Sequence, residues 1–251
     1  MKPEERQAEI RTAVERDGEV SVVDLVARYG VSGETIRRDL AHLAATGAVQ
    51  KVHGGARRPV VHVENSFDER MSEQAAEKAI IGQKLHRVVA PGDSCFIDTG
   101  TTTLACARAL AEIPDLVVIT NSARIARVFG RSDKTGQTFL LGGLYVADNV
   151  ETVGPMVLDQ IRQFHVDHAI IGVAAMDAGA GALDADADEA AVARAMCAQA
   201  RQVVVVAGSG KFARRAAHRV CGFDGMDVLV TDTPPAEPFR AALAAAEVRL
   251  C

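Results

Sequence analysis

Near the start of the chain, apolar residues recur at helical spacing in three short segments. Those between residues 4 and 16 fall on one face among charged residues and predict a helix that ends near Gly18. Ser21 can cap a second helix, which runs to Gly30. A third helix begins at Ser32, after a join of only a few residues. Two short helices joined this tightly through a glycine predict a helix-turn-helix.

The third helix is predicted to present a basic outer face. Ile36, Leu40 and Leu43 recur at i, i+4 and i+7 and should face inward, with Val31 placed to staple the helix start against Ile36. The outward positions carry hydroxyl and basic side chains of the kind that contact DNA: Ser32, Thr35, Arg37, Arg38 and His42. Paired arginines alone are a weak signal, because on an exposed face they are usually solvated.

A basic hairpin is predicted directly after this helix. Beyond Thr46 and Gly47, the sequence AVQKVHGGARRPV indicates two strands around a turn at Gly54 and Gly55. A hairpin in this place is the wing of a winged helix, which lies along the phosphates or enters the minor groove. Its candidate DNA contacts are Lys51, His53, Arg57 and Arg58. Helix and wing together predict a DNA-binding domain over residues 1–58.

The pattern then changes to apolar strands that alternate with helical stretches. Such alternation predicts an α/β domain around a largely parallel sheet, with ligands at the carboxyl ends of the strands. We place this domain at residues 75–251, after a linker at 59–74. The predicted strands are 94–98, 116–120, 167–173, 203–207 and 227–231, and the predicted helices are 103–111, 122–130 and 187–200.

The loop that follows the first of these strands is a candidate phosphate site. Gly100 lets the backbone approach a ligand, the amides at the helix start point outward, and neighbouring hydroxyls add donors. The candidate residues of this loop are Asp98, Thr99, Gly100, Thr101, Thr102 and Thr103. A capped turn from strand to helix, without a ligand, is the alternative. Further candidates for the same sheet edge are Asn121, Gly143, Lys78 and Lys211.

Charge and composition narrow the class of protein. The chain has 251 residues and a formal net charge of −5, yet residues 1–58 hold ten Lys and Arg against nine Asp and Glu, so the acidity belongs to the remainder. A local basic footprint is enough for nucleic acid. No apolar stretch approaches the roughly 18 residues of a membrane span, so we expect a soluble, cytoplasmic protein. The five cysteines are widely spread and predict buried, reduced thiols without a metal.

Two motifs that would indicate an enzyme or a metal site fail on chemical grounds. GSGKF resembles part of a P-loop, but Val205 stands where the first glycine is needed and no Ser or Thr follows Lys211. LDADADEA resembles the start of a calcium loop, but Glu189 stands where the turn needs glycine and Ala195 where the closing Glu is needed. We therefore expect no cofactor, no metal and no catalytic residue.

The string VSGETIRRDLAHLAATGAVQKVHGGA resembles the N-terminal signature of the DeoR family of bacterial transcriptional regulators. IDTGTTTLACARAL, VVITNS, LLGG, VDHAIIGV and VTD follow in the family's order, and ADNVETVGPMVLDQIRQF is similar to its glycerol-3-phosphate regulator branch. The resemblance implies a sensing domain related in fold to ribose-phosphate isomerases and CoA transferases. It also implies a repressor, a homodimer or homotetramer, that leaves its operator when a phosphorylated sugar or polyol binds, with the 98–103 loop on the phosphate.

One loop departs from the family pattern. Gly208 replaces the usual acid and Gly210 the serine before Lys211, so a ligand hydroxyl normally met by the carboxylate loses that partner. The competing hypothesis is a sugar-phosphate isomerase with an attached DNA-binding domain. It would need a carboxylate base beside a substrate carbon, for which Asp98, Asp167, Asp177 and Glu189 are the candidates. Their spacing assigns no acid–base pair.

Overall fold

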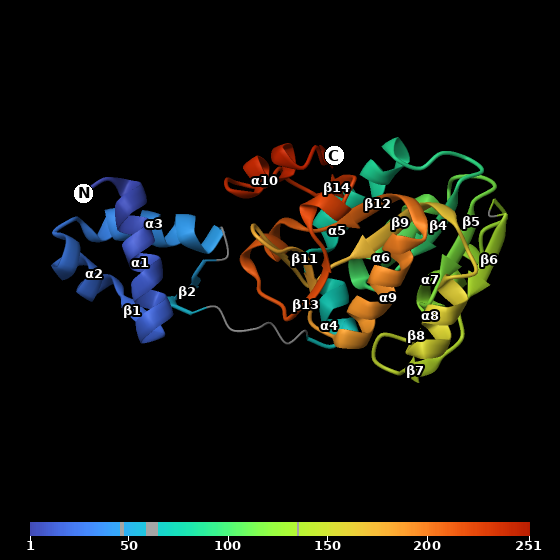
Figure 1. The fold of residues 1–251 in the computed structure, drawn as a ribbon, viewed down its shortest axis with the longest axis horizontal. Coiled ribbons are helices and arrows are strands. Elements are labelled where there is room, and N and C mark those ends of the chain that lie inside the picture. The colour runs from blue at the N-terminus through green and yellow to red at the C-terminus, as the bar shows by residue number, and fades with distance from the viewer. Residues whose placement is uncertain (46–47, 59–64, 135) are drawn as a thin grey trace.

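The computed structural model describes residues 1–45, 48–58, 65–134 and 136–251 (Figure 1). The N-terminal unit contains three helices and a small antiparallel sheet in the strand order β1-β3-β2. Its elements are α1 (Pro3–Asp17), β1 (Glu19–Ser21), α2 (Val22–Tyr29), α3 (Gly33–Ala45), β2 (Gln50–Val52) and β3 (Gly55–Arg57). The predicted winged helix is confirmed in these elements, while Thr46 and Gly47 lie outside the described residues.

Local signals in the sequence set the ends of these helices. The Ser21 hydroxyl accepts the Asp24 backbone N–H at 3.0 Å, and the Ser32 hydroxyl accepts that of Thr35 at 3.2 Å. Each bond satisfies an N–H that has no partner within the helix. Gly30 ends α2 in the left-handed conformation, at φ 64°, which glycine adopts without strain. The predicted starts of α2 and α3 are therefore confirmed.

The second unit is an α/β domain. Its strands are β4 (Ser94–Ile97), β5 (Val117–Thr120), β6 (Gln137–Leu140), β7 (Leu144–Val146), β8 (Glu151–Val153), β9 (Val166–Gly172), β10 (Ala175–Asp177), β11 (Gly181–Asp184), β12 (Ala200–Val206), β13 (His218–Cys221), β14 (Val228–Val230) and β15 (Arg249–Leu250). Its helices are α4 (Phe67–Ser72), α5 (Ala75–Lys84), α6 (Thr101–Leu110), α7 (Ala123–Phe129), α8 (Pro155–Ile161), α9 (Ala187–Ala198) and α10 (Phe239–Ala245), with 3-10 turns η1 (Leu85–Arg87), η2 (Ser209–Ala213) and η3 (Phe223–Gly225).

Seven strands form one parallel sheet in the order β15-β14-β12-β9-β4-β5-β6. Both faces are covered, so neighbouring residues of a strand enter different cores: Phe96 packs with α8, α9 and α10, and Ile97 packs with α5, α6 and α7. This explains why the strands read as continuous apolar runs in the sequence. The predicted α/β class and the five predicted strands are confirmed.

Several elements were not predicted. The structure adds an antiparallel sheet β10-β11-β13, a hairpin β7-β8 and the edge strands β6 and β15. Part of the segment predicted as a linker is folded, because Phe67 of α4 is 1% exposed and belongs to the core around α5 and α6. Residues 59–64 lie outside the described residues. None of the helices in the described ranges is both long and apolar enough to cross a membrane.

Candidate functional sites for DNA and for an effector

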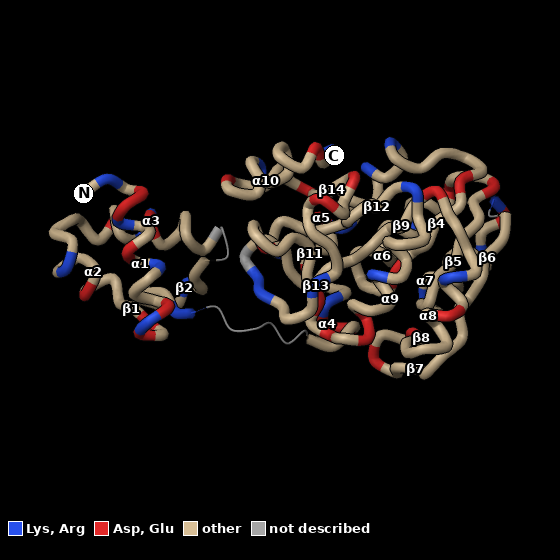
Figure 2. Tube along the Cα trace, in the orientation of Figure 1, with Lys and Arg blue, Asp and Glu red and all other residues tan. Residues whose placement is uncertain are grey.

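The outer face of α3 carries the residues predicted to contact DNA. Ser32, Arg37, Arg38 and His42 are exposed, and Thr35 is half-buried. Arg37 is 3.4 Å from the Glu34 carboxylate, an exposed pair that a phosphate or base can replace at little cost. Charged residues are dense over this unit (Figure 2). The structure therefore groups the predicted helix residues on one solvent-facing surface.

The wing lies next to that surface. Arg37, Lys51 and His53 line one groove between α3 and the hairpin, and Gly54 and Gly55 form its floor. A Cβ at Gly55 would lie 2.2 Å from the Val20 carbonyl oxygen, so only glycine allows β3 to approach β1 this closely.

The two wing arginines differ in their contacts. Arg57 donates from Nε to Gln50 Oε1 at 2.8 Å and remains exposed. Arg58 donates to the Glu15 carbonyl oxygen at the end of α1. Arg57 is thus held on the hairpin, whereas the Arg58 side chain contacts the first helix.

In the α/β domain, the 98–103 loop forms one wall of a pocket. Gly100 has φ 141°, and α6 begins at Thr101, so the first N–H groups of the helix face the pocket mouth. Thr101, Thr102 and Thr103 are buried, and Thr103 donates from its hydroxyl to the Gly100 carbonyl oxygen at 3.0 Å. A helix start of this form binds anions through its amides and its dipole.

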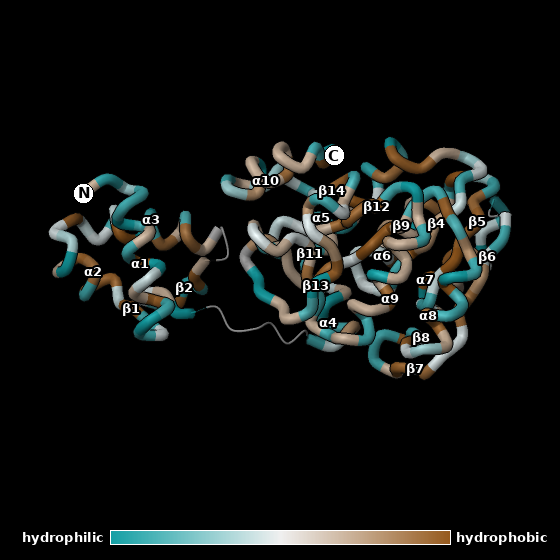
Figure 3. The backbone as a smooth tube through the Cα atoms, in the orientation of Figure 1, coloured by the Kyte–Doolittle hydropathy of each residue, from teal (hydrophilic) through white to brown (hydrophobic). Residues whose placement is uncertain are grey.

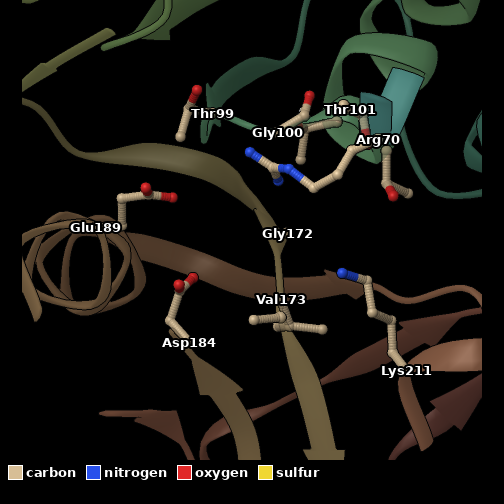
Figure 4. Close-up of a pocket in the computed structure, with 12 residues that line it drawn as sticks. Arg70, Thr99, Gly100, Thr101, Gly172, Val173, Asp184, Glu189 and Lys211 are labelled. Carbon is tan, nitrogen blue, oxygen red and sulfur yellow. Dashed lines mark hydrogen bonds between the residues drawn. The ribbon is translucent and has the colours of Figure 1, made fainter. Parts of the chain in front are cut away.

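The pocket lies at the carboxyl ends of the strands and holds about 340 Å³ of space between the atoms, including its open mouth. Figure 4 shows Asp184 and Glu189 on one side, Lys211 on the other, and the Arg70 guanidinium between them. Its lining residues are Arg70, Thr99, Gly100, Thr101, Thr102, Thr103, Gly172, Val173, Ala174, Asp184, Glu189 and Lys211. One wall of the pocket is therefore rich in hydrogen-bond donors, and another wall carries carboxylates.

Arg70 is a pocket residue that the sequence did not single out. It lies on α4 and is 9% exposed, and its guanidinium donates to Asn149 Oδ1 at 2.7 Å and to the Asn65 carbonyl oxygen at 3.0 Å. In the sequence, Arg70 falls in the segment predicted as a linker. The signal that identifies Arg70 is the capping box formed by Ser66 and Glu69, which places the arginine inside a helix rather than in a linker.

Four of the predicted effector residues do not line the main pocket. Lys78 donates from Nζ to the carbonyl oxygens of Arg70 and Glu73, and burial, together with the Lys211 cation, lowers its pKa to about 8. Asn121 donates to Glu151 Oε2 at 3.0 Å inside the domain. The other two are Asp98 and Gly143. Lys78 still borders a smaller cavity that it shares with Thr101 and Lys211.

Gly143 has a packing role. A Cβ at this position would lie 2.5 Å from Val157 Cγ2 and 2.7 Å from the Val153 carbonyl oxygen. The glycine thus allows the chain after β6 to touch α8 and β8 closely. Gly143 follows β6, the outermost strand of the sheet, and is not among the residues that line the pocket.

Asp98 lies directly behind the phosphate loop and is 3% exposed. Burial raises its pKa well above the ordinary value, and the nearby carboxylates Asp184 and Glu151 raise it further. Burial likewise raises the pKa of Glu151 to about 7, although the Asn149 and Asn121 amides donate to it at 2.9 and 3.0 Å. The raised pKa values favour the neutral forms of both carboxyls, which limits the negative charge close to the loop.

The loop after β12 departs from the family pattern at Gly208 and Gly210, and the structure shows which side chains lie beside these two glycines. A Cβ at Gly210 would lie 2.8 Å from Gln74 Nε2, so the Gln74 side chain takes the space above this glycine. At Gly208, a Cβ would lie 3.9 Å from Asp232 Oδ1, and that oxygen accepts the Ser209 N–H at 2.6 Å. A carboxylate from the end of β14 therefore stands next to the position where the acid is missing.

The described residues contain no group of three or more His, Cys, Asp or Glu side chains placed to hold a metal ion.

Comparison with known proteins matches each of the two parts of the molecule to a known domain family. Residues 6–60 match the DeoR-like helix-turn-helix domain, and residues 73–233 match the DeoR C terminal sensor domain. The chain is 33% identical over 235 residues to the glycerol-3-phosphate regulon repressor of Escherichia coli, covering 94% of this chain and 93% of that protein. It is 32% identical over 241 residues to the transcriptional repressor GlcR of Bacillus subtilis, covering 95% and 92%.

Among solved structures, the chain is similar to eIF2B beta from Chaetomium thermophilum, with a TM-score of 0.50 and 18% identity over 72% of this chain and 55% of that one. This likeness concerns the fold alone. The helix-turn-helix and the sensor domain together define a DNA-binding transcriptional regulator. The chain belongs to the DeoR family.

Proposed function

We propose that this protein is a repressor whose sensing domain binds a phosphorylated sugar, polyol or related intermediate and thereby releases the operator. The named relatives are repressors. The observation that carries the proposal is the pocket at the sheet edge, in which a helix start and two cations stand opposite two carboxylates. A ligand with an anionic end and a hydroxyl-bearing end matches both walls.

The anionic end of the effector fits the α6 wall. The backbone amides of Thr101 and Thr102 and the dipole of a ten-residue helix favour a phosphate there. Lys211 and Arg70 supply positive charge from η2 and α4. Arg70 donates to the Asn149 side chain and to the Asn65 carbonyl oxygen, and these two contacts hold its guanidinium at the pocket.

The hydroxyl-bearing end fits the opposite wall. Asp184 and Glu189 present carboxylate oxygens, which accept hydrogen bonds from hydroxyl groups. Thr99 Oγ1 is buried at the pocket and has no hydrogen-bond partner among the described residues. A ligand hydroxyl would satisfy it, because a buried polar atom without a partner costs free energy.

On the DNA side, we propose that α3 enters the major groove with Ser32, Thr35, Arg37, Arg38 and His42, and that Lys51, His53, Arg57 and Arg58 lie along the backbone. Two heads in a dimer or tetramer would meet two half-sites. The effector shifts the DNA-bound population only by its different affinities for two arrangements of the heads. Its binding in the pocket must therefore favour an arrangement that does not fit the operator.

The test uses the purified full chain and a fragment of DNA from upstream of the operon it controls. Glycerol 3-phosphate and a panel of sugar phosphates are each added to the protein–DNA complex and, separately, to the free protein. We expect one phosphorylated compound to raise the melting temperature and release the DNA, and glycerol or inorganic phosphate alone to do neither. Failure of every phosphorylated compound to shift the melting temperature would contradict the proposal. Conversion of a compound, followed by NMR, would support the isomerase hypothesis instead.

A further inference from the structure

An uncharged apolar surface covers the β6 edge of the sheet and the adjacent hairpin. Nine large apolar side chains are exposed among the described residues, and five of them lie here. They are Phe139 (40%), Leu140 (51%), Leu144 (70%), Tyr145 (58%) and Met156 (66%). We call these five residues the edge patch. Scattered exposed apolar residues are ordinary, but a cluster of this kind marks an interaction site.

Hydrogen bonds connect the elements that carry the edge patch. The Gln160 side chain on α8 accepts the Gly142 N–H at 3.1 Å and donates to the Gly142 carbonyl oxygen at 2.7 Å and to the Met156 carbonyl oxygen at 2.9 Å. Leu144 pairs with Val153, two residues before α8 begins. The end of β6, the start of β7 and the first turn of α8 are therefore neighbours in the fold.

The absence of charge on this edge needs an explanation. From residue 137 to residue 147 the sequence contains no Asp, Glu, Lys or Arg, and the tube through this stretch in Figure 2 is uniformly tan. In the described part of the chain, β6 pairs only with β5, so its other side presents unpaired backbone groups. Natural edge strands are normally protected by charged residues, by proline or by a covering element. Here neither charge nor proline protects the strand. The tube at β7 includes brown, hydrophobic segments (Figure 3).

We propose that the edge patch is the contact surface between two copies of this chain. Its five side chains expose roughly 600 Å². A dimer of ordinary size buries about 800 Å² on each partner, and these five side chains would supply most of that area. An uncharged surface also suits a twofold contact, in which the same residues meet themselves and like charges would repel.

The opposite edge of the sheet differs from β6, so the exposed apolar surface is not a general property of edge strands in this protein. At the opposite edge, β15 is two residues long, and of its side chains Arg249 is charged and Leu250 is 39% exposed. That edge has the protection that β6 lacks. The inference therefore concerns β6 and its hairpin, and it does not depend on which effector the pocket binds.

The test measures the mass of the full chain by sedimentation equilibrium over a range of concentrations. We expect self-association that Leu144→Asp and Tyr145→Asp each weaken at least tenfold, because each places a charge against its own copy. Leu250→Asp and Val23→Asp are matched controls, exposed apolar residues outside the patch, and should associate as the unchanged protein does. Circular dichroism and thermal melting show that every variant is folded.

Three outcomes would overturn the proposal. One is an unchanged protein that stays monomeric at tens of micromolar, which would assign the patch to a different partner. Another is unaltered association of both patch variants. The third is dissociation by Leu250→Asp but not by Leu144→Asp, which would move the contact to β15. As an independent readout, a photo-crosslinking residue at position 145 should join two copies, detected as mixed peptides when isotope-labelled and unlabelled protein are combined.

Discussion

Arg6 and Asp39 form a buried ion pair, with Arg6 Nε 2.6 Å from Asp39 Oδ2 and side chains 7% and 5% exposed. Gln7 donates to the other carboxylate oxygen at 2.9 Å, so α1 holds both oxygens of a residue on α3. Asp39 is the acid directly after Arg37 and Arg38. Because its charge is paired inside the unit, Asp39 adds no exposed negative charge beside Arg37 and Arg38.

Replacing Asp39 with Ala should destabilise the DNA-binding unit by about 3–5 kcal/mol, because it leaves the Arg6 guanidinium buried without its partner. Urea unfolding followed by circular dichroism measures the loss. Glu34→Ala, which removes an exposed acid from the same helix, is the control and should change stability by less than about 0.5 kcal/mol. Equal effects of the two changes would show that burial of the pair has no consequence.

Replacing Arg37 or Arg38 with Ala should weaken operator binding by about 1–3 kcal/mol if the side chain reads a base, with stability nearly intact. Fluorescence anisotropy at several salt concentrations measures the change. A side chain that contacts only phosphate should instead reduce the salt dependence and weaken all sequences alike. Arg11→Ala on α1 is the matched control, since this arginine is exposed and pairs with the exposed Glu15. Unchanged affinity in both α3 variants would remove these residues from the interface.

Lys211→Ala should abolish effector-induced release while the protein still binds its operator, because it removes a charge from the proposed phosphate site. Thr101→Glu should act in the same direction by placing an acid at the helix start. The readout is the midpoint of DNA release in a titration with the effector. Lys134→Ala is the control, as that lysine lies on the surface beside Glu112. Normal induction in both pocket variants would exclude this wall from the site.

We expect the sensing domain to become less stable as the pH rises from about 5 to 8, because Glu151 then loses a proton that the folded state holds. Its pKa in the folded domain is about 7, above the ordinary 4.5, so the folded state binds the proton more tightly than the unfolded state. The stabilisation from this proton is complete below pH 4.5 and is lost as the pH rises through 7. Asp98 acts in the same direction.

Melting temperatures of the unchanged protein and of Glu151→Gln, measured across this range, test the effect. We expect the variant to lose less stability between pH 5 and pH 8 than the unchanged protein, by about 2–3 kcal/mol at most. Asp159→Asn, an exposed acid on α8, provides the control and should keep the slope of the unchanged protein. Parallel slopes for Glu151→Gln and the unchanged protein would show that Glu151 does not hold the proton.

The sequence predicted those features that depend on local pattern. The caps at Ser21 and Ser32 and the parallel strands follow from spacing and apolar runs, and the structure contains them. Arg70 was missed because α4 is only six residues long, and its place in the pocket depends on contacts with Asn149, 79 positions away. Gly143 was assigned to the ligand because a glycine suits both close backbone approach and close packing, and only the neighbouring Val157 distinguishes them.

The carboxylate wall is the clearest example of a long-range effect. In the sequence, Asp184 and Glu189 belong to the acidic run LDADADEA, which was considered as a calcium loop and rejected. In the structure, Asp186 of this run caps α9 by accepting the Asp188 and Glu189 backbone N–H groups. The pocket forms because the end of β11 and the first turn of α9 lie opposite the start of α6. That arrangement depends on the order of the elements in the fold and not on any local signal in the sequence.

The turn between β7 and β8 contacts residues of the effector pocket and is also joined to the strand that carries the edge patch. On its inner side, Asn149 contacts Arg70 and Glu189, and Asp148 accepts the Phe67 N–H at 3.1 Å. β7, the strand that leads into this turn, carries Leu144 and Tyr145 on the proposed contact surface. With that contact in place, the effector and the second copy act on the same short hairpin. By reciprocity, the effector's dissociation constant then varies with the concentration of the protein itself.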